Sequence, residues 1–394
     1  MKLTEFLAVM TGDPNTLFWS GLFAALCLIA VLAYFHVMKP KAGTIEWIRL
    51  FGRKRSEPFS FRPLHRGDVL PFLLSFGVAW FLCGFRLIAH AKMGLLDPSG
   101  RDMVRTIFFG SCVTLILAAV IYCFFRLFYG SKTVAALVAG LSSALCSHET
   151  YALILIFLSW ICLYLWICYS NREFRRIYAL LVLLSGLFYG IALMACWASF
   201  YLLPIYIAGY CVGKRCQWHR GDLEKRKGRL LLSLLMLVIL LLVGTLFLWL
   251  LYYVFTSENT AFWTAALSGD TYHTILSTLL EKLTDITVPR SEGIRPMQTD
   301  LFTPILFVFS LIPTAHGAFV RRNNYARAAL FCSVPFLAAW LIAGVDLMLA
   351  GSMPVIGWML KGFVDRERRR YAVYISIAVV FCYFGCLMLS QIQF

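Results

Sequence analysis

Charged residues are scarce in this sequence. Asp, Glu, Lys and Arg make up 14% of its 394 residues, whereas 60% are hydrophobic, and the mean hydropathy is +0.77. A soluble domain of this length would carry a clearly larger charged fraction. Apolar runs of about 20 residues, enough to cross a bilayer as helices, recur along the whole chain. The composition therefore predicts a helical membrane protein, because helices satisfy their own backbone hydrogen bonds in lipid.

Several motifs that would define a chemistry are also missing. There is no Gly-rich phosphate loop of the Walker type, which excludes an ATP-driven motor within this chain. There is no arginine ladder of a voltage sensor and no Gly-rich filter of the potassium-channel kind. His148 and Glu149 begin a HExxH zinc pattern, but Ala152 stands where the second histidine is required. A zinc protease is therefore excluded.

Paired cysteines of the CxxC type are absent, although the chain contains 13 cysteines. Most of these cysteines lie within apolar runs, where a thiol behaves as a small buried hydrophobic group. No His-rich cluster accompanies them. We therefore expect neither a structural zinc site nor a disulfide framework, and we expect no cofactor, with a divalent cation left open.

The apolar runs predict a single all-α membrane domain with about 10 to 11 spans. These runs cover residues 17–37, 69–90, 106–128, 133–148, 151–170, 177–194, 196–212, 229–254, 301–320, 327–350 and 371–391. The regions are an extra N-terminal span (17–37), a basic loop (38–68), a core (69–255), an external loop (255–300) and C-terminal spans (301–394). No small-residue cleavage site follows the first run, so we expect it to stay attached. Loop 255–300 has amphipathic stretches that favour helices lying in the interface plane.

The net charge of +16 is concentrated in short loops between the apolar runs. The basic loops are residues 38–68, 171–176, 213–229 and 321–327. All four fall on one side of the predicted membrane domain, which the positive-inside rule makes cytoplasmic. This distribution indicates orientation and contact with membrane lipids rather than binding to nucleic acid.

The opposite, non-cytoplasmic side receives loops 91–105 and 255–300, and the latter is more acidic than basic. One segment disagrees with this count. Residues 364–370 are strongly basic, yet simple alternation of spans places them outside. We therefore expect that segment 351–363 crosses only part of the membrane.

The external loop 91–105 contains two carboxylates, Asp97 and Asp102. Asp97 lies in an Asp-Pro-Ser-Gly sequence typical of an ordinary turn, and Asp102 suits a helix start. The alternative is a general base at the membrane surface, which needs hydrogen-bond reach to an acceptor hydroxyl.

Other ionisable residues are expected on the same external side. His148 and Glu149 lie between two apolar runs, where they either face water in a turn or line a wet cavity. Arginines suit the binding of a phosphate through bidentate hydrogen bonds. The candidates for this role are Arg101, Arg105, Arg290 and Arg295, for which a solvated loop is the alternative.

The middle of the chain has a characteristic order of segments. A span ends in Arg-Leu-Phe-Tyr-Gly (Arg126 to Gly130), and a span rich in small residues follows. A polar break with Glu149, an apolar span, a basic turn and a Gly-rich span come next. Over about residues 69–255 this order resembles the GT-C superfamily of membrane glycosyltransferases, which includes protein O-mannosyltransferases and bacterial lipid A aminoarabinose transferases.

The resemblance implies an all-helical enzyme that takes a sugar from a polyprenyl-phosphate donor on the non-cytoplasmic face. It also implies inversion at the anomeric carbon and a catalytic acid in the first external loop, which by position is Asp97 or Asp102. The expected acceptor is a cell-surface glycan or lipid, and the expected location is the plasma membrane. A transporter or flippase of lipid-linked saccharides and a polysaccharide polymerase remain as alternatives, and the oligomeric state stays open.

Overall fold

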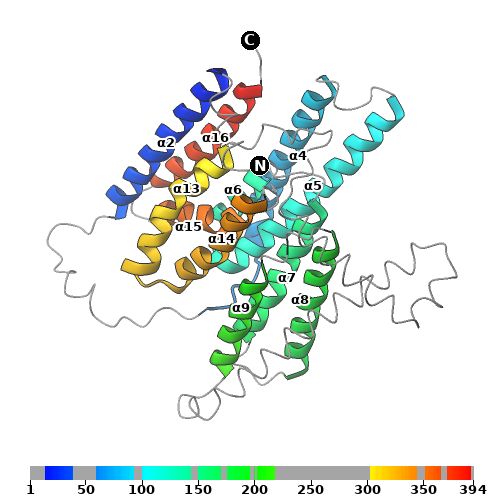
Figure 1. The fold of residues 1–394 in the computed structure, drawn as a ribbon, viewed down its shortest axis with the longest axis vertical. Coiled ribbons are helices and arrows are strands. Elements are labelled where there is room, and N and C mark those ends of the chain that lie inside the picture. The colour runs from blue at the N-terminus through cyan, green and yellow to red at the C-terminus, as the bar shows by residue number, and fades with distance from the viewer. Residues whose placement is uncertain are drawn as a thin grey trace.

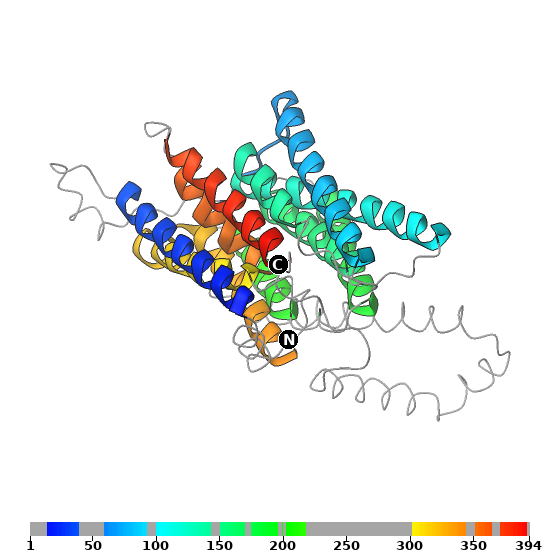
Figure 2. The ribbon, with the colours of Figure 1, turned by 90° about the horizontal axis from the view of Figure 1, so that it is seen from above.

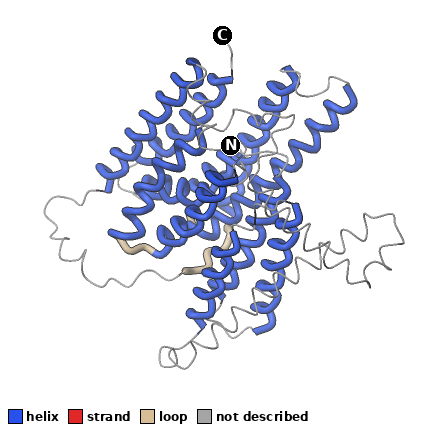
Figure 3. The backbone as a smooth tube through the Cα atoms, in the orientation of Figure 1, coloured by secondary structure: helices blue, strands red, loops and turns tan. Residues whose placement is uncertain are grey.

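The protein folds into helices throughout the part that its structure, a computed structural model, describes (Figure 1; Figure 3). The described residues are 14–38, 59–92, 100–142, 150–169, 175–195, 199, 202–217, 302–343, 351–364 and 371–391. The α-helices are α2 (Pro14–Met38), α4 (Val69–Lys92), α5 (Gly100–Tyr129), α6 (Lys132–Ser142), α7 (Thr150–Tyr169), α8 (Arg175–Ala195), α9 (Leu203–Gln217), α13 (Phe302–Ala315), α14 (Asn324–Ala343), α15 (Met353–Val364) and α16 (Tyr371–Gln391). A 3-10 turn, η1 (Arg66–Asp68), precedes α4, and a π-helical turn, η5 (His316–Val320), follows α13. The all-α prediction is confirmed.

Three helical segments of the described chain are long and apolar enough to span a bilayer. They are Leu17–Val37, Cys112–Tyr129 and Phe302–Val320. Shorter apolar helices accompany them at Lys132–Leu141, Ala152–Cys168, Leu180–Leu193, Leu203–Gly213, Met353–Val364 and Val373–Cys386. These apolar helices indicate a membrane protein, and the larger span count remains a prediction.

The helices pack in two groups that meet at α15. Helices α2, α13, α14 and α16 pack around one side of α15, and α4 to α9 form the other group. Figure 2 shows α2 beside α16, on the side of the molecule away from α4 and α5. Helix α15 contacts both α5 and α6, so it joins the two groups.

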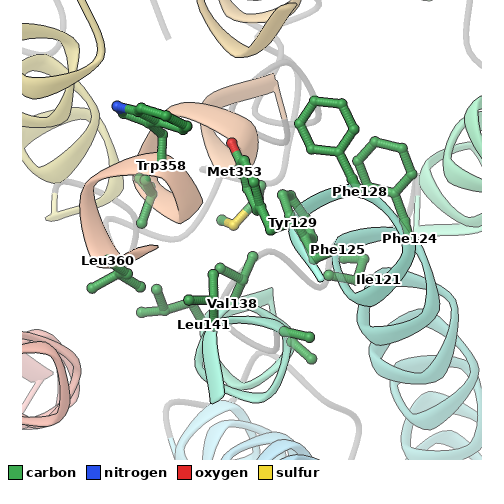
Figure 4. Close-up of a cluster of buried hydrophobic side chains, with 14 of the residues drawn as sticks. Ile121, Phe124, Phe125, Phe128, Tyr129, Val138, Leu141, Met353, Trp358 and Leu360 are labelled. Carbon is green, nitrogen blue, oxygen red and sulfur yellow. The ribbon is translucent and has the colours of Figure 1, made fainter. Parts of the chain in front are cut away.

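Buried aromatic and aliphatic side chains fill the junction between the groups. In Figure 4, Met353 and Trp358 of α15 face Phe125 and Tyr129 of α5, with Val138 of α6 below. The close fit requires a glycine in α15, because a Cβ at Gly357 would lie 2.7 Å from the Tyr129 ring. Packing of this density makes the two groups one continuous core.

Helix α15 is too short to cross a membrane. Its 12 residues extend about 18 Å, against about 30 Å of hydrocarbon. It is nevertheless buried almost completely, with Lys361 and Val364 half-buried at its end. Its length agrees with the partial crossing expected for 351–363, and the side of the membrane on which 364–370 lie remains a prediction.

Candidate functional site

The residues predicted to carry chemistry are distributed between α5 and stretches outside the described residues. Arg101, Asp102 and Arg105 lie in the first two turns of α5, where the structure describes the helical backbone and not the side chains. Asp97, His148, Glu149, Arg290 and Arg295 lie outside the described residues. Whether these eight residues converge on one site therefore remains a prediction.

Asp102 lies near the start of α5, far from Arg126 near the end of the same helix. The helix has 30 residues and is about 45 Å long, longer than the hydrocarbon core. The apolar run within it begins at residue 106 of the sequence, so residues 100–105 precede that run. The backbone of Asp102 lies about 36 Å along the axis from Arg126. Figure 1 shows this first part of α5 at the upper right, beside the end of α4.

At its other end, α5 carries a buried ion pair that the sequence analysis missed. The Arg126 Nε donates to Asp68 Oδ1 at 2.7 Å, and both side chains are 7% exposed. Arg126 also donates from Nη1 to the Gly130 carbonyl at 3.0 Å, which closes the turn into α6. Gly130 has φ +73°, a left-handed conformation that favours glycine. The pair thus ties the start of α4 to the turn between α5 and α6.

The second carboxylate oxygen of Asp68 is also occupied. Asp68 Oδ2 accepts the backbone N–H of His65 at 2.6 Å, and the Asp68 carbonyl accepts the Tyr122 hydroxyl at 3.1 Å. Burial by itself would raise the pKa of Asp68, but the hydrogen bonds from Arg126 and His65 and the positive charges of Arg126 and Lys132 outweigh it and lower the pKa. An ionised, fully bonded carboxylate makes a structural anchor and a poor general base.

Two further cations converge on the carbonyl of Tyr129. Arg62 Nη1 donates to this oxygen at 2.7 Å and Lys361 Nζ at 3.0 Å. Both cations also lie 5.7 Å from the centre of the Tyr325 ring. Arg62 belongs to the segment before η1, and Lys361 belongs to the end of α15; both contact the last residue of α5. We call Arg62, Lys361, Tyr129 and Tyr325 the cation cluster.

Hydrogen bonds fix the segment that carries Arg62. The Ser60 N–H donates to the Tyr325 hydroxyl at 3.1 Å, and the Tyr164 hydroxyl donates to the Ser60 carbonyl at 2.9 Å. Lys132 of α6 donates to the Gly67 carbonyl at 3.2 Å. The segment is therefore held between α14, α7 and α6.

These contacts bring the described parts of the basic loops to one end of the molecule. The loops drawn in tan in Figure 3, before η1 and between η5 and α14, lie away from the upper ends of α4 and α5. Ser60 of the first loop contacts Tyr325 near the second. This arrangement agrees with the common side that the positive-inside rule assigned to loops 38–68 and 321–327. We call it the basic end.

The sequence contained a signal for the ion pair, although its partners were not matched. Asp68 directly precedes the apolar run 69–90, and Arg126 stands near the end of another. An acid and an arginine at the ends of neighbouring spans are good candidates for pairing, since charges near a bilayer are retained when partnered. Arg62 carried no comparable signal, because loop cations are common on a cytoplasmic face.

The described residues hold no group of three or more His, Cys, Asp or Glu suited to a metal ion. Their one carboxylate with a described side chain, Asp68, is already bonded at both oxygens. Among the described residues, the basic end therefore offers cations but no free carboxylate. The assignment of a general base to loop 91–105 remains a prediction.

Comparison with known proteins gives limited information. No protein-family model and no curated protein matches the sequence. Among solved structures, the fold is similar to the apo crystal structure of an oligosaccharyltransferase from Archaeoglobus fulgidus, with a TM-score of 0.42 and 10% sequence identity. The match covers 94% of this chain, which spans about half the length of that protein, 55%. A likeness at this level carries no inference about the chemistry of this chain.

Proposed function

We propose that this chain is a multi-pass plasma-membrane glycosyltransferase of the GT-C type. It transfers a sugar from a polyprenyl-phosphate donor to a cell-surface glycan or lipid on the non-cytoplasmic face. Support comes from the order of segments around Arg126 to Gly130 and Glu149, which resembles that superfamily. The apolar helices supply the membrane setting that such a donor requires.

The main structural support for the proposal is the position of the first residues of α5. The helix begins six residues before its apolar run, and these residues, 100–105, include Arg101, Asp102 and Arg105 at the end away from the basic loops. A carboxylate and two arginines at a membrane surface match what a lipid-phosphate leaving group and an acceptor hydroxyl need.

The chemistry then follows an inverting displacement. Asp97 or Asp102 removes the proton from the acceptor hydroxyl, and the acceptor oxygen forms a bond to the anomeric carbon. The bond from that carbon to the phosphate oxygen breaks, and polyprenyl phosphate leaves with the electron pair. Arg101, Arg105, Arg290 and Arg295 stabilise the departing phosphate, which is an electrostatic contribution of large size. His148 and Glu149 line the sugar cavity.

The test is sugar transfer by the purified full-length protein. A panel of radiolabelled polyprenyl-phosphate sugars serves as donor, and a cell-envelope extract serves as acceptor. Asp97→Asn and Asp102→Asn are compared with Lys132→Gln, a surface change at the basic end. We expect the base variant to lose about 10²- to 10⁴-fold in transfer rate and the control to keep it.

Full activity of both Asn variants would exclude either aspartate as the base. Movement of intact lipid-linked sugar across vesicle membranes without any transfer would instead identify a flippase. Long products from a single acceptor would identify a polymerase.

A further inference from the structure

The cation cluster at the basic end has a feature that the proposed function does not use. Arg62 and Lys361 donate to the same carbonyl oxygen, so their nitrogens lie within about 6 Å of each other, a distance at which like charges repel. The guanidinium of Arg62 also packs directly on Gly130, where an added Cβ would lie 2.1 Å from Nη1. Two half-buried cations are thus held in a fixed geometry.

We propose that this cluster binds the headgroup phosphate of an anionic membrane lipid. Arg62 makes one hydrogen bond to the described residues, through Nη1, and its remaining N–H groups are available to a ligand. Two oxygens of a tetrahedral phosphate can accept a bidentate pair of hydrogen bonds from the planar guanidinium. The phosphate also neutralises the repulsion between the two cations, which a neutral ligand does not.

The surroundings of Arg62 favour a lipid over a soluble phosphate. The segment that carries Arg62 alternates exposed apolar and basic side chains, with Leu64 51% exposed and Arg66 exposed two residues later. Leu70, at the start of α4, is 67% exposed. Apolar side chains beside cations at the end of a membrane helix suit the boundary between headgroups and acyl chains.

The experiment measures lipid retention by native mass spectrometry of the purified full-length protein. Phosphatidylglycerol and phosphatidylcholine are titrated separately into the wild type, Arg62→Gln, Lys361→Gln and the double variant. Arg322→Gln is the matched control, since it removes one exposed positive charge from the loop between η5 and α14 at the same end. Size-exclusion profiles verify folding of each variant, and Lys361→Gln tests the site independently if Arg62→Gln fails to fold.

We expect the wild type to retain phosphatidylglycerol and not phosphatidylcholine. Each cluster substitution weakens retention by about fivefold, and the double variant by about 25-fold, whereas Arg322→Gln changes it less than about twofold. Equal weakening by Arg322→Gln and Arg62→Gln would overturn the proposal, because it would show that retention depends on the overall positive charge of this surface. Displacement of the lipid by inorganic phosphate in excess would overturn the lipid assignment. Both outcomes leave the proposed sugar transfer at the other end of α5 unaffected.

Discussion

Charged residues stand at both ends of α5, and we propose different roles for the two sets. At the basic end, Arg126 is buried and bonded to Asp68 and to the Gly130 carbonyl. At the other end, Arg101, Asp102 and Arg105 lie in the first two turns of the helix, before its apolar run begins at residue 106. A charge at a membrane helix end is used for folding when the bundle supplies its partner. In our proposal, the charged residues near the start of α5 instead bind the substrate and act on it.

The largest effect on folding is expected at the basic end. Asp68→Asn removes the charge that compensates Arg126, whose side chain is 7% exposed. Breaking a buried pair in this way costs about 3–5 kcal/mol of unfolding free energy. Thermal unfolding in detergent measures the loss. The double variant Asp68→Asn, Arg126→Met should recover part of it, and an additive loss in the double variant would show that the two residues do not interact.

A substitution at the opposite end should change catalysis instead. Arg101→Gln and Arg105→Gln each remove a proposed partner of the leaving phosphate. We expect transfer activity to fall by about 10²-fold or more, with the thermal midpoint unchanged. A midpoint that drops while activity per folded molecule persists would place these arginines among the structural residues.

A smaller loss of stability is expected from Gly130→Ala. The left-handed backbone at φ +73° costs an alanine about 1–2 kcal/mol, and the added Cβ displaces Arg62. Gly21→Ala in α2 is the matched control, because a Cβ there meets nothing within 4 Å. The control should be neutral or stabilising, since alanine is the better helix former. Equal midpoints for the two variants would contradict the role of the turn.

The smallest effect is a pH dependence of stability. Because the folded-state pKa of Asp68 lies below its usual value, its stabilisation is complete above the unfolded-state pKa and is lost as pH falls through the folded-state pKa. The thermal midpoint of the wild type should therefore fall more steeply below about pH 4 than that of Asp68→Asn. Parallel curves for the two proteins would show that Asp68 does not contribute.

Sequence patterns predicted the helical class and the proximity of two basic loops, and the short helix α15 agrees with the partial crossing predicted for 351–363. These features depend on hydropathy and on local charge, which a single sequence records. The pairing of Asp68 with Arg126 spans 58 positions, and that of Lys361 with the Tyr129 carbonyl spans 232. Such contacts depend on how the two helix groups pack at α15, and hydropathy does not determine which helices become neighbours. The convergence of Asp97, Glu149 and Arg290 stays a prediction for the same reason.

The most direct test compares the two ends of the molecule in one assay. Transfer activity per folded molecule and thermal midpoint are measured together for Asp97→Asn, Asp102→Asn and Asp68→Asn. We predict that one of the first two variants loses about 10²- to 10⁴-fold in activity at an unchanged midpoint. Asp68→Asn should show a lowered midpoint with activity within about threefold of the wild type. Loss of activity in folded Asp68→Asn, with both external variants fully active, would contradict the assignment of catalysis to the end of α5 that carries Asp102.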